Sequence, residues 1–187
     1  MIHSVKFKAI LDTNVIFPII IRDLMLWFAH YDLYTPKWSI GIFSEWKTVM
    51  LRKGVSDDEA NKRIQKINRA FPDATVQNYE PLIDHLDLED PDDRHVLAAA
   101  IKSNSNVIVT NNLKDFPEDY LVTFGLTAKT ADDFLTDIID LNPEIAIRAF
   151  KEMVLNKQNP KMDDYQVLES LRRVGLEDTA NYLHAML

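Results

Sequence analysis

The chain has 187 residues, of which 47% are hydrophobic and 27% are charged, and it contains no cysteine. That composition is sufficient for one hydrophobic core of ordinary size, and it excludes a disulfide framework, a thiolate nucleophile and a cysteine zinc site. No apolar run reaches the roughly 18 residues of a membrane span and the N-terminus lacks the features of a secretory signal, so we expect a cytoplasmic protein with no membrane partner.

The formal net charge of −8 is unevenly distributed along the chain. Residues 1–79 carry a net charge of +3, residues 80–140 carry −10 and residues 141–187 carry −1. Within the first part, the segment from Lys47 to Arg69 holds seven basic and three acidic residues. An acidic pocket beside a basic surface would suit a metal-dependent enzyme that acts on a polyanion. On charge alone, however, we favour the simpler interpretation that these are solvated helix faces.

Short apolar strands alternate with amphipathic helices in the first part of the chain. The run FKAIL predicts a strand that ends abruptly at Asp12, and an apolar helix follows it. Ser39 and Ser56 are predicted helix caps, and Gly54 is predicted to end a helix. This alternation predicts a parallel α/β sheet in three layers. We predict strands at 7–11, 34–38, 75–78 and 107–110, and helices at 15–31, 40–53, 56–70, 81–85 and 93–103.

The predicted strands cease after Asn142-Pro143, and the rest of the chain has the pattern of helices. We therefore divide the chain into an α/β domain at residues 1–141 and a helical C-terminal extension at residues 142–187. The predicted helices of the extension are 144–155, 163–173 and 176–186.

Two acidic residues stand at predicted strand ends. Asp12 directly follows the first strand, and Asp115 lies in the loop after the strand VIVT. Because open parallel sheets bind ligands beyond the carboxyl ends of their strands, we expect these two carboxylates to meet at one edge. Taken singly, Asp12 could instead cap a helix and Asp115 could form a turn.

Two further acidic residues lie on apolar helix faces. Asp93 shares a face with Val96 and Leu97, and Glu45 lies at the edge of its own helix's apolar stripe. A carboxylate on a buried face is costly to desolvate unless it has a partner. Four converging carboxylates are better explained by a shared hard cation such as Mg²⁺ or Mn²⁺, which can activate a water for phosphoryl displacement. We expect His95 to be a surface or supporting residue, because no histidine pair has zinc spacing.

Four sequence blocks carry a resemblance to a known family. They are LDTNV at 11–15, WSIGIFSEW at 38–46, DPDDRHVLAAAI at 90–101 and VIVTNNLKDFP at 107–117. In this order they resemble PIN-domain ribonucleases, and most closely the VapC-type toxins of bacterial toxin–antitoxin pairs. The resemblance covers roughly residues 5–140, and the tail is similar to a helical extension on one branch of these toxins.

The resemblance implies a PIN-like three-layer α/β/α sandwich with a central parallel sheet. It also implies bound Mg²⁺ or Mn²⁺, cleavage of RNA phosphodiester bonds, a cognate antitoxin as partner, and a homodimer. Motif by motif, it assigns catalysis and metal binding to Asp12, Glu45 and Asp93. Thr13 and Asn14 would fix Asp12 through hydrogen bonds.

The fourth acidic position departs from the family pattern. Many relatives have an acid soon after the threonine of the last strand, where this chain has Asn112, and the next acid is Asp115. Either Asp115 takes the fourth catalytic and metal-binding role, or a second metal position is weakened. Asn112 can still ligate through its carbonyl oxygen, but it lacks a charge. We expect Asp90 and Asn112 to support the site from outside the metal ligands.

One basic helix face is a candidate RNA-binding surface, because Lys62, Lys66 and Arg69 recur at i, i+4 and i+7. Three alternatives to a ribonuclease stay open. A degenerate PIN module would bind RNA or a protein without cutting, and Asn112 is its support. A receiver-type phosphoacceptor would require paired acids after the first strand, where this chain has only Asp12. A DNA-directed nuclease would share the chemistry of the site.

Overall fold

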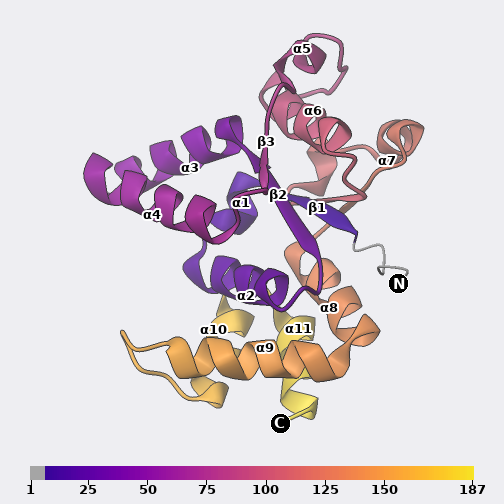
Figure 1. The fold of residues 1–187 in the computed structure, drawn as a ribbon. Coiled ribbons are helices and arrows are strands. Elements are labelled where there is room, and N and C mark those ends of the chain that lie inside the picture. The colour runs from indigo at the N-terminus through magenta and orange to yellow at the C-terminus, as the bar shows by residue number, and fades with distance from the viewer. Residues whose placement is uncertain (1–6) are drawn as a thin grey trace.

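A five-stranded parallel sheet with the order β3-β2-β1-β4-β5 forms the centre of the computed structural model, which describes residues 7–187 (Figure 1). The expectation about a secretory signal concerns an N-terminus whose residues 1–6 lie outside the described residues. The strands are β1 Lys8–Leu11, β2 Thr35–Ser39, β3 Thr75–Val76, β4 Val107–Val109 and β5 Thr127–Lys129.

The register places the most apolar strands in the middle of the sheet. Ile10 of β1 lies opposite Lys37 of β2 on one side and Ile108 of β4 on the other. Ile108 in turn lies opposite Ala128 of the edge strand β5. Ile10 and Ile108 are fully buried, as is typical of parallel strands that are covered on both faces. This arrangement confirms the predicted three-layer fold.

Two helices in the first part of the chain begin at serine caps that the sequence predicts. The Ser39 hydroxyl accepts a hydrogen bond from the Ile42 N–H (3.2 Å), and the Ser56 hydroxyl accepts one from the Glu59 N–H (3.3 Å). Gly54 follows α3 with φ +84°, a left-handed conformation that favours glycine. The helices here are α1 Thr13–Ile16, α2 Ile19–His30, α3 Ile40–Arg52, α4 Asp57–Ala70 and α5 Glu80–Ile83.

The predicted single helix at 15–31 is wrong, because the structure divides it into α1 and α2. Pro18 stands between them in an extended conformation (φ −67°, ψ 117°). Proline has no N–H with which to continue the hydrogen bonds of α1. The short α1 begins at Thr13, where the Asp12 side chain accepts a hydrogen bond from the Thr13 N–H.

The second half of the sheet domain contains elements that the sequence analysis did not predict. The edge strand β5 has three residues, with Ala128 as its single apolar side chain, so it carries no strand pattern. The helix predicted at 93–103 begins at Arg94, because Asp93 belongs to a 3₁₀ turn that starts at Pro91. The elements are η1 Pro91–Asp93, α6 Arg94–Lys102, η2 Leu113–Asp115, α7 Glu118–Leu121, η3 Val122–Phe124 and α8 Ala131–Leu141.

The three predicted C-terminal helices are present as α9 Pro143–Asn156, α10 Asp164–Arg173 and α11 Glu177–Ala185. They pack on the sheet domain, because α9 contacts α2 and α11 contacts α8. The Asp132 side chain of α8 accepts hydrogen bonds from the N–H groups of Asp178 (3.0 Å) and Thr179 (2.8 Å) at the start of α11. Among the described residues, no helix has the length and apolar character of a membrane span.

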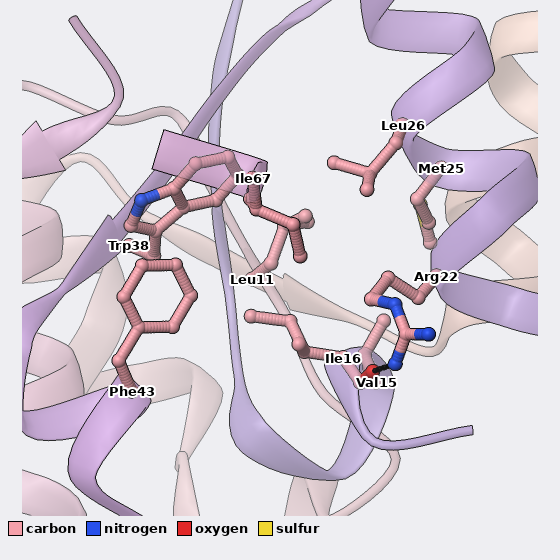
Figure 2. Close-up of a pocket in the computed structure, with 9 residues that line it drawn as sticks. All are labelled: Leu11, Val15, Ile16, Arg22, Met25, Leu26, Trp38, Phe43 and Ile67. Carbon is pink, nitrogen blue, oxygen red and sulfur yellow. Dashed lines mark hydrogen bonds between the residues drawn. The ribbon is translucent and has the colours of Figure 1, made fainter. Parts of the chain in front are cut away.

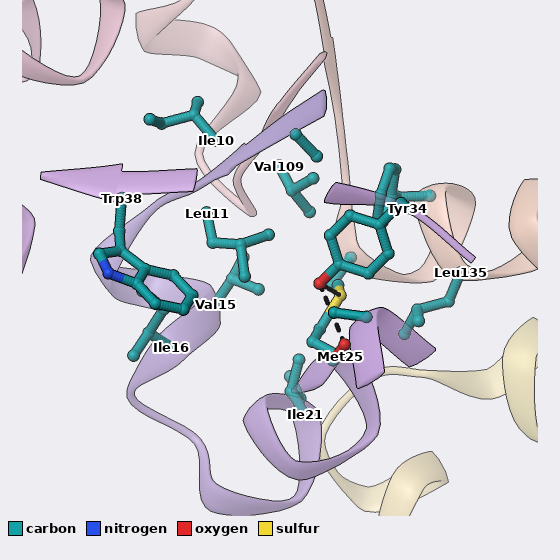
Figure 3. Packing of buried hydrophobic residues seen from close by; sticks show 14 of the residues in the cluster. Ile10, Leu11, Val15, Ile16, Ile21, Met25, Tyr34, Trp38, Val109 and Leu135 are labelled. Carbon is teal, nitrogen blue, oxygen red and sulfur yellow. Dashed lines mark hydrogen bonds between the residues drawn. The ribbon is translucent and has the colours of Figure 1, made fainter. Parts of the chain in front are cut away.

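The core lies on both faces of the sheet. Figure 1 shows α6 on one side of the strands and α2 on the other, with α9, α10 and α11 beyond α2. Figure 3 shows Leu11 and Val109 from the central strands beside Val15 and Met25. The hydroxyl of buried Tyr34 donates a hydrogen bond to the Met25 carbonyl oxygen (3.1 Å). This packing fixes the strand ends from which the candidate site is built.

Candidate metal centre

Acidic residues from four separate elements converge at the carboxyl end of the sheet. Asp12 directly follows β1, and Asp115 lies in the turn after the neighbouring strand β4. Glu45 lies on α3, which begins directly after β2, and Asp93 directly precedes α6. Because β2, β1 and β4 are parallel neighbours, their carboxyl ends bring these segments to one edge.

Asp12 is only 5% exposed, and both of its carboxylate oxygens accept hydrogen bonds. Oδ1 accepts from the Thr13 N–H (2.6 Å), and Oδ2 accepts from Asn14 Nδ2 (2.6 Å) and the Thr110 hydroxyl (2.8 Å). Burial raises the pKa of Asp12, the bonds from Thr110 and Thr13 lower it, and the nearby Glu45 charge raises it. The net direction is upward. The predicted contacts of Thr13 and Asn14 with Asp12 are therefore present.

Thr110 is a residue of this site that the sequence analysis did not single out. Its hydroxyl contacts Asp12, and the Asn14 side-chain amide also donates to it (3.0 Å). The Asn111 N–H donates to Asn14 Oδ1 (2.9 Å), so Asn14 links the ends of β1 and β4. The signal that could have identified Thr110 is a polar side chain, fully buried here, that closes the apolar run VIVT.

Glu45 also has a donor for each of its carboxylate oxygens. The Thr13 hydroxyl donates to Oε2 (2.6 Å), and His95 Nε2 lies 2.9 Å from Oε1. Burial raises the pKa of Glu45, but the hydrogen bonds from His95 and Thr13 outweigh it, and the net direction is downward. The structure thus favours a charged Glu45.

Asp90, Asp93 and Asp115 form a closely spaced acidic group among the described residues. One carboxylate oxygen of each lies within 4.8 Å of the others. Burial raises the pKa of Asp93 to about 7, with further contributions from the charges of Asp12, Asp115 and Asp90 and from a hydrogen bond with Asp115. Asp90, expected outside the metal ligands, therefore contributes an oxygen to this group. With a pKa of about 7, Asp93 is about half protonated at neutral pH when no cation is bound.

Asn112 contacts the acid that the sequence analysis placed in the fourth role. Its side-chain Nδ2 donates a hydrogen bond to Asp115 Oδ2, and its backbone N–H donates to the Thr110 hydroxyl (3.1 Å). The amide therefore orients Asp115, whose side chain is 15% exposed. The negative charge at this position comes from Asp115 itself.

The donor set fits a hard divalent cation. Every candidate ligand atom in the cluster is a carboxylate oxygen, which is the ligand type that Mg²⁺ and Mn²⁺ prefer. Burial is the largest cause of the raised pKa of Asp93, and the charges of Asp12, Asp115 and Asp90 add to it. A cation would relieve the repulsion among Asp93, Asp90 and Asp115.

The candidate RNA-binding residues lie on a solvent-exposed face of α4, which packs on α3. Lys62, Lys66 and Arg69 are all exposed, and Lys62 forms an ion pair with Asp58 (2.6 Å) on the same helix. The structure therefore places these residues on the helix neighbouring the one that carries Glu45. Their contact with RNA stays a prediction.

A small cavity near Arg22 does not extend the site. Figure 2 shows the side chains that line this cavity. Its volume is about 10 Å³, roughly the space of one water molecule. Arg22 Nη1 donates to the Ile16 carbonyl oxygen (3.1 Å), and the guanidinium lies 5.0 Å from the ring centroid of Trp46. The other side chains around the cavity are apolar, so it is a packing defect rather than a substrate pocket.

Comparisons with known proteins match two parts of the chain. Residues 8–114, more than half of the chain, match the family model described as PIN domain, and residues 131–185 match the model described as VapC50 C-terminal domain. A protein of Mycobacterium tuberculosis named "Putative ribonuclease VapC50" is 42% identical over 79 residues, which are 42% of this chain and 47% of that protein. The matched stretch thus spans about half the length of that curated relative. No solved structure matches the chain.

Proposed function

The chain belongs to the PIN domain family, and from this premise we propose that it is a metal-dependent endoribonuclease, the toxin of a toxin–antitoxin pair, that hydrolyses RNA phosphodiester bonds. The observation that carries the proposal is the convergence of Asp12, Asp93 and Asp115 at the end of the parallel sheet. A relative named as a ribonuclease and a matching C-terminal family model support the same assignment.

We assign the metal to the acidic residues that meet at the carboxyl end of the sheet. Asp12, Glu45, Asp93 and Asp115 would hold Mg²⁺ or Mn²⁺, and the oxygen of Asp90 within the cluster supports a ligand role for that residue too. When bound, such a cation lowers the pKa of a coordinated water and stabilises the charge that develops on the phosphate.

The chain's own residues orient the acidic side chains of this site. Thr13 and Asn14 supply donors that hold the Asp12 carboxylate in one orientation, and Asn112 does the same for Asp115. Burial, and then the charges of Asp12, Asp115 and Asp90, raise the pKa of Asp93 to about 7, so Asp93 would release its proton when a cation binds.

The remaining assignments follow from this function. RNA would pass over the exposed basic face of Lys62, Lys66 and Arg69, whose charges would offset the repulsion between the acidic cluster and the phosphates. The cognate antitoxin would cover the site, and we propose a homodimer that acts in the cytoplasm. Residues 1–141 would form the nuclease domain and residues 142–187 the extension. Binding without cleavage is not favoured, because Asp115 retains the charge that Asn112 lacks.

The experiment is cleavage of a labelled single-stranded RNA pool by the purified chain. We expect cleavage with Mg²⁺ or Mn²⁺, loss of cleavage in excess EDTA, and recovery when the metal is restored. Asp12→Asn should abolish activity, whereas Asp92→Asn, an exposed acid in the same acidic segment as Asp90, should retain it. Undiminished cleavage in EDTA would contradict the metal mechanism, and RNA binding without any cleavage would select the degenerate PIN module.

A further inference from the structure

His95 contacts Glu45, but it has no role in the proposed chemistry. Its side chain is only 15% exposed, near the start of α6, and Nε2 lies 2.9 Å from Glu45 Oε1. Its second ring nitrogen, Nδ1, is buried and has no hydrogen-bond partner in the described part of the chain. The ring therefore directs its one polar contact at Glu45.

Glu45 is held from two sides of the site. The Thr13 hydroxyl occupies Oε2, and Thr13 directly follows Asp12. His95 occupies Oε1, and it lies two residues after Asp93. A carboxylate with a donor on each oxygen is restricted to one orientation, whereas a carboxylate with one donor can rotate about its last bond.

Gly41 leaves the space that the imidazole ring needs. A Cβ at this position would lie 2.9 Å from His95 Nδ1 and 3.0 Å from the Tyr79 hydroxyl oxygen, distances too short for ordinary contact. Gly41 lies in the first turn of α3, four residues before Glu45, where glycine is otherwise unfavourable in a helix. Its N–H donates to the Tyr79 hydroxyl (3.1 Å), so Tyr79 closes the other side of this space.

We propose that His95 is a positioning residue that fixes the Glu45 carboxylate for the metal site, and that Gly41 is required because any side chain there would displace the imidazole ring. The inference rests on the proposed function. It predicts that a change at Gly41, which removes no polar side chain, has the same effect as a change at His95.

The test measures Mn²⁺ affinity by calorimetry together with kcat and KM for RNA cleavage. His95→Ala should weaken Mn²⁺ binding and lower kcat by about tenfold each, the lower end of effects seen for residues that orient metal ligands, with KM little changed. His95→Gln should recover most of this loss, because its side-chain amide can donate to Oε1. Gly41→Ala should resemble His95→Ala, and His85→Ala, at an exposed histidine, should resemble the unmodified chain.

A double-mutant cycle separates positioning from a general structural role. In the Glu45→Gln background, His95→Ala should cause no further loss of Mn²⁺ affinity, because the carboxylate that it orients is gone. Additive losses would overturn the proposal, as would an unaltered Mn²⁺ affinity in His95→Ala or a His95→Gln variant no better than His95→Ala. Since Mn²⁺ affinity is measured without RNA, failure of the ribonuclease assignment would leave this result intact.

Discussion

Replacing Asp93 by Asn should stabilise the metal-free protein at pH 8. The pKa of Asp93 rises from the ordinary 3.8 to about 7, chiefly through burial and then through the charges of Asp12, Asp115 and Asp90. The pKa of Asp93 is higher in the folded protein than in the unfolded chain, so protonation of Asp93 favours the folded state. This stabilising contribution is fully present below about pH 4. That contribution is lost progressively as the pH rises to about 7, and it is absent above that. Asparagine resembles the protonated acid and carries no such pH dependence.

The size of the effect follows from the shift. A shift of about three pKa units corresponds to about 4 kcal/mol for a fully buried group. Asp93 is only partly buried, so solvent screening reduces the expected gain in the free energy of unfolding to about 2 kcal/mol at pH 8. Below about pH 4 the variant and the unmodified chain should be equally stable.

Urea unfolding followed by circular dichroism in EDTA, at pH 4 and pH 8, measures this difference. Asp92→Asn, at an exposed acid in the same 3₁₀ turn, serves as the control and should change stability little. With Mn²⁺ at about 100 times its Kd, the unmodified chain should gain about 2.7 kcal/mol, and Asp93→Asn should gain much less. If Asp93→Asn lowers the stability of the metal-free protein at pH 8, then Asp93 is a structural residue and the reasoning fails.

Two further predictions concern the RNA surface and the C-terminal extension. Neutralising Lys62, Lys66 and Arg69 together should weaken RNA binding and reduce the slope of log affinity against log salt concentration by about 0.7 per lost contact. The kcat for cleavage should change little. An unchanged slope would show that this face does not bind RNA. Asp132→Ala should lower the free energy of unfolding by about 2 kcal/mol in urea titrations, because it leaves two N–H groups and one hydroxyl of α11 without their acceptor. Asp140→Ala, on an exposed position of the same helix, should have little effect, and equal losses in both variants would refute the capping role.

The parts of the fold that could be predicted are those with a strong local signal. Apolar runs such as VIVT and the caps at Ser39 and Ser56 identify β4, α3 and α4 with little help from the rest of the chain. β5 has one apolar residue, so its strand conformation depends on pairing with β4 rather than on its own sequence. The break at Pro18 carried a local signal, but the apolar pattern on both sides of it masked that signal.

The candidate site also contains residues that a local sequence pattern can identify and contacts that only the fold creates. Asp12 and Asp93 could be identified because a carboxylate at a strand end or on an apolar helix face conflicts with its local surroundings. The contact between His95 and Glu45 joins residues that are 50 positions apart, so no local pattern reveals it. The contact of Asn112 with Asp115 spans only three residues, but its direction depends on the η2 turn.

The two sides of the acidic site differ in how they offset burial, which by itself raises the pKa of both Glu45 and Asp93. On one side, Glu45 has Thr13 and His95 as donors, and its pKa falls. On the other side, the charges of Asp12, Asp115 and Asp90 add to the effect of burial, and the pKa of Asp93 rises to about 7. The protein therefore compensates the charge of Glu45 with its own groups and leaves that of Asp93 uncompensated. A divalent cation would supply the missing positive charge on the Asp93 side, so metal affinity should fall steeply below pH 7 as protons compete for the Asp93 carboxylate.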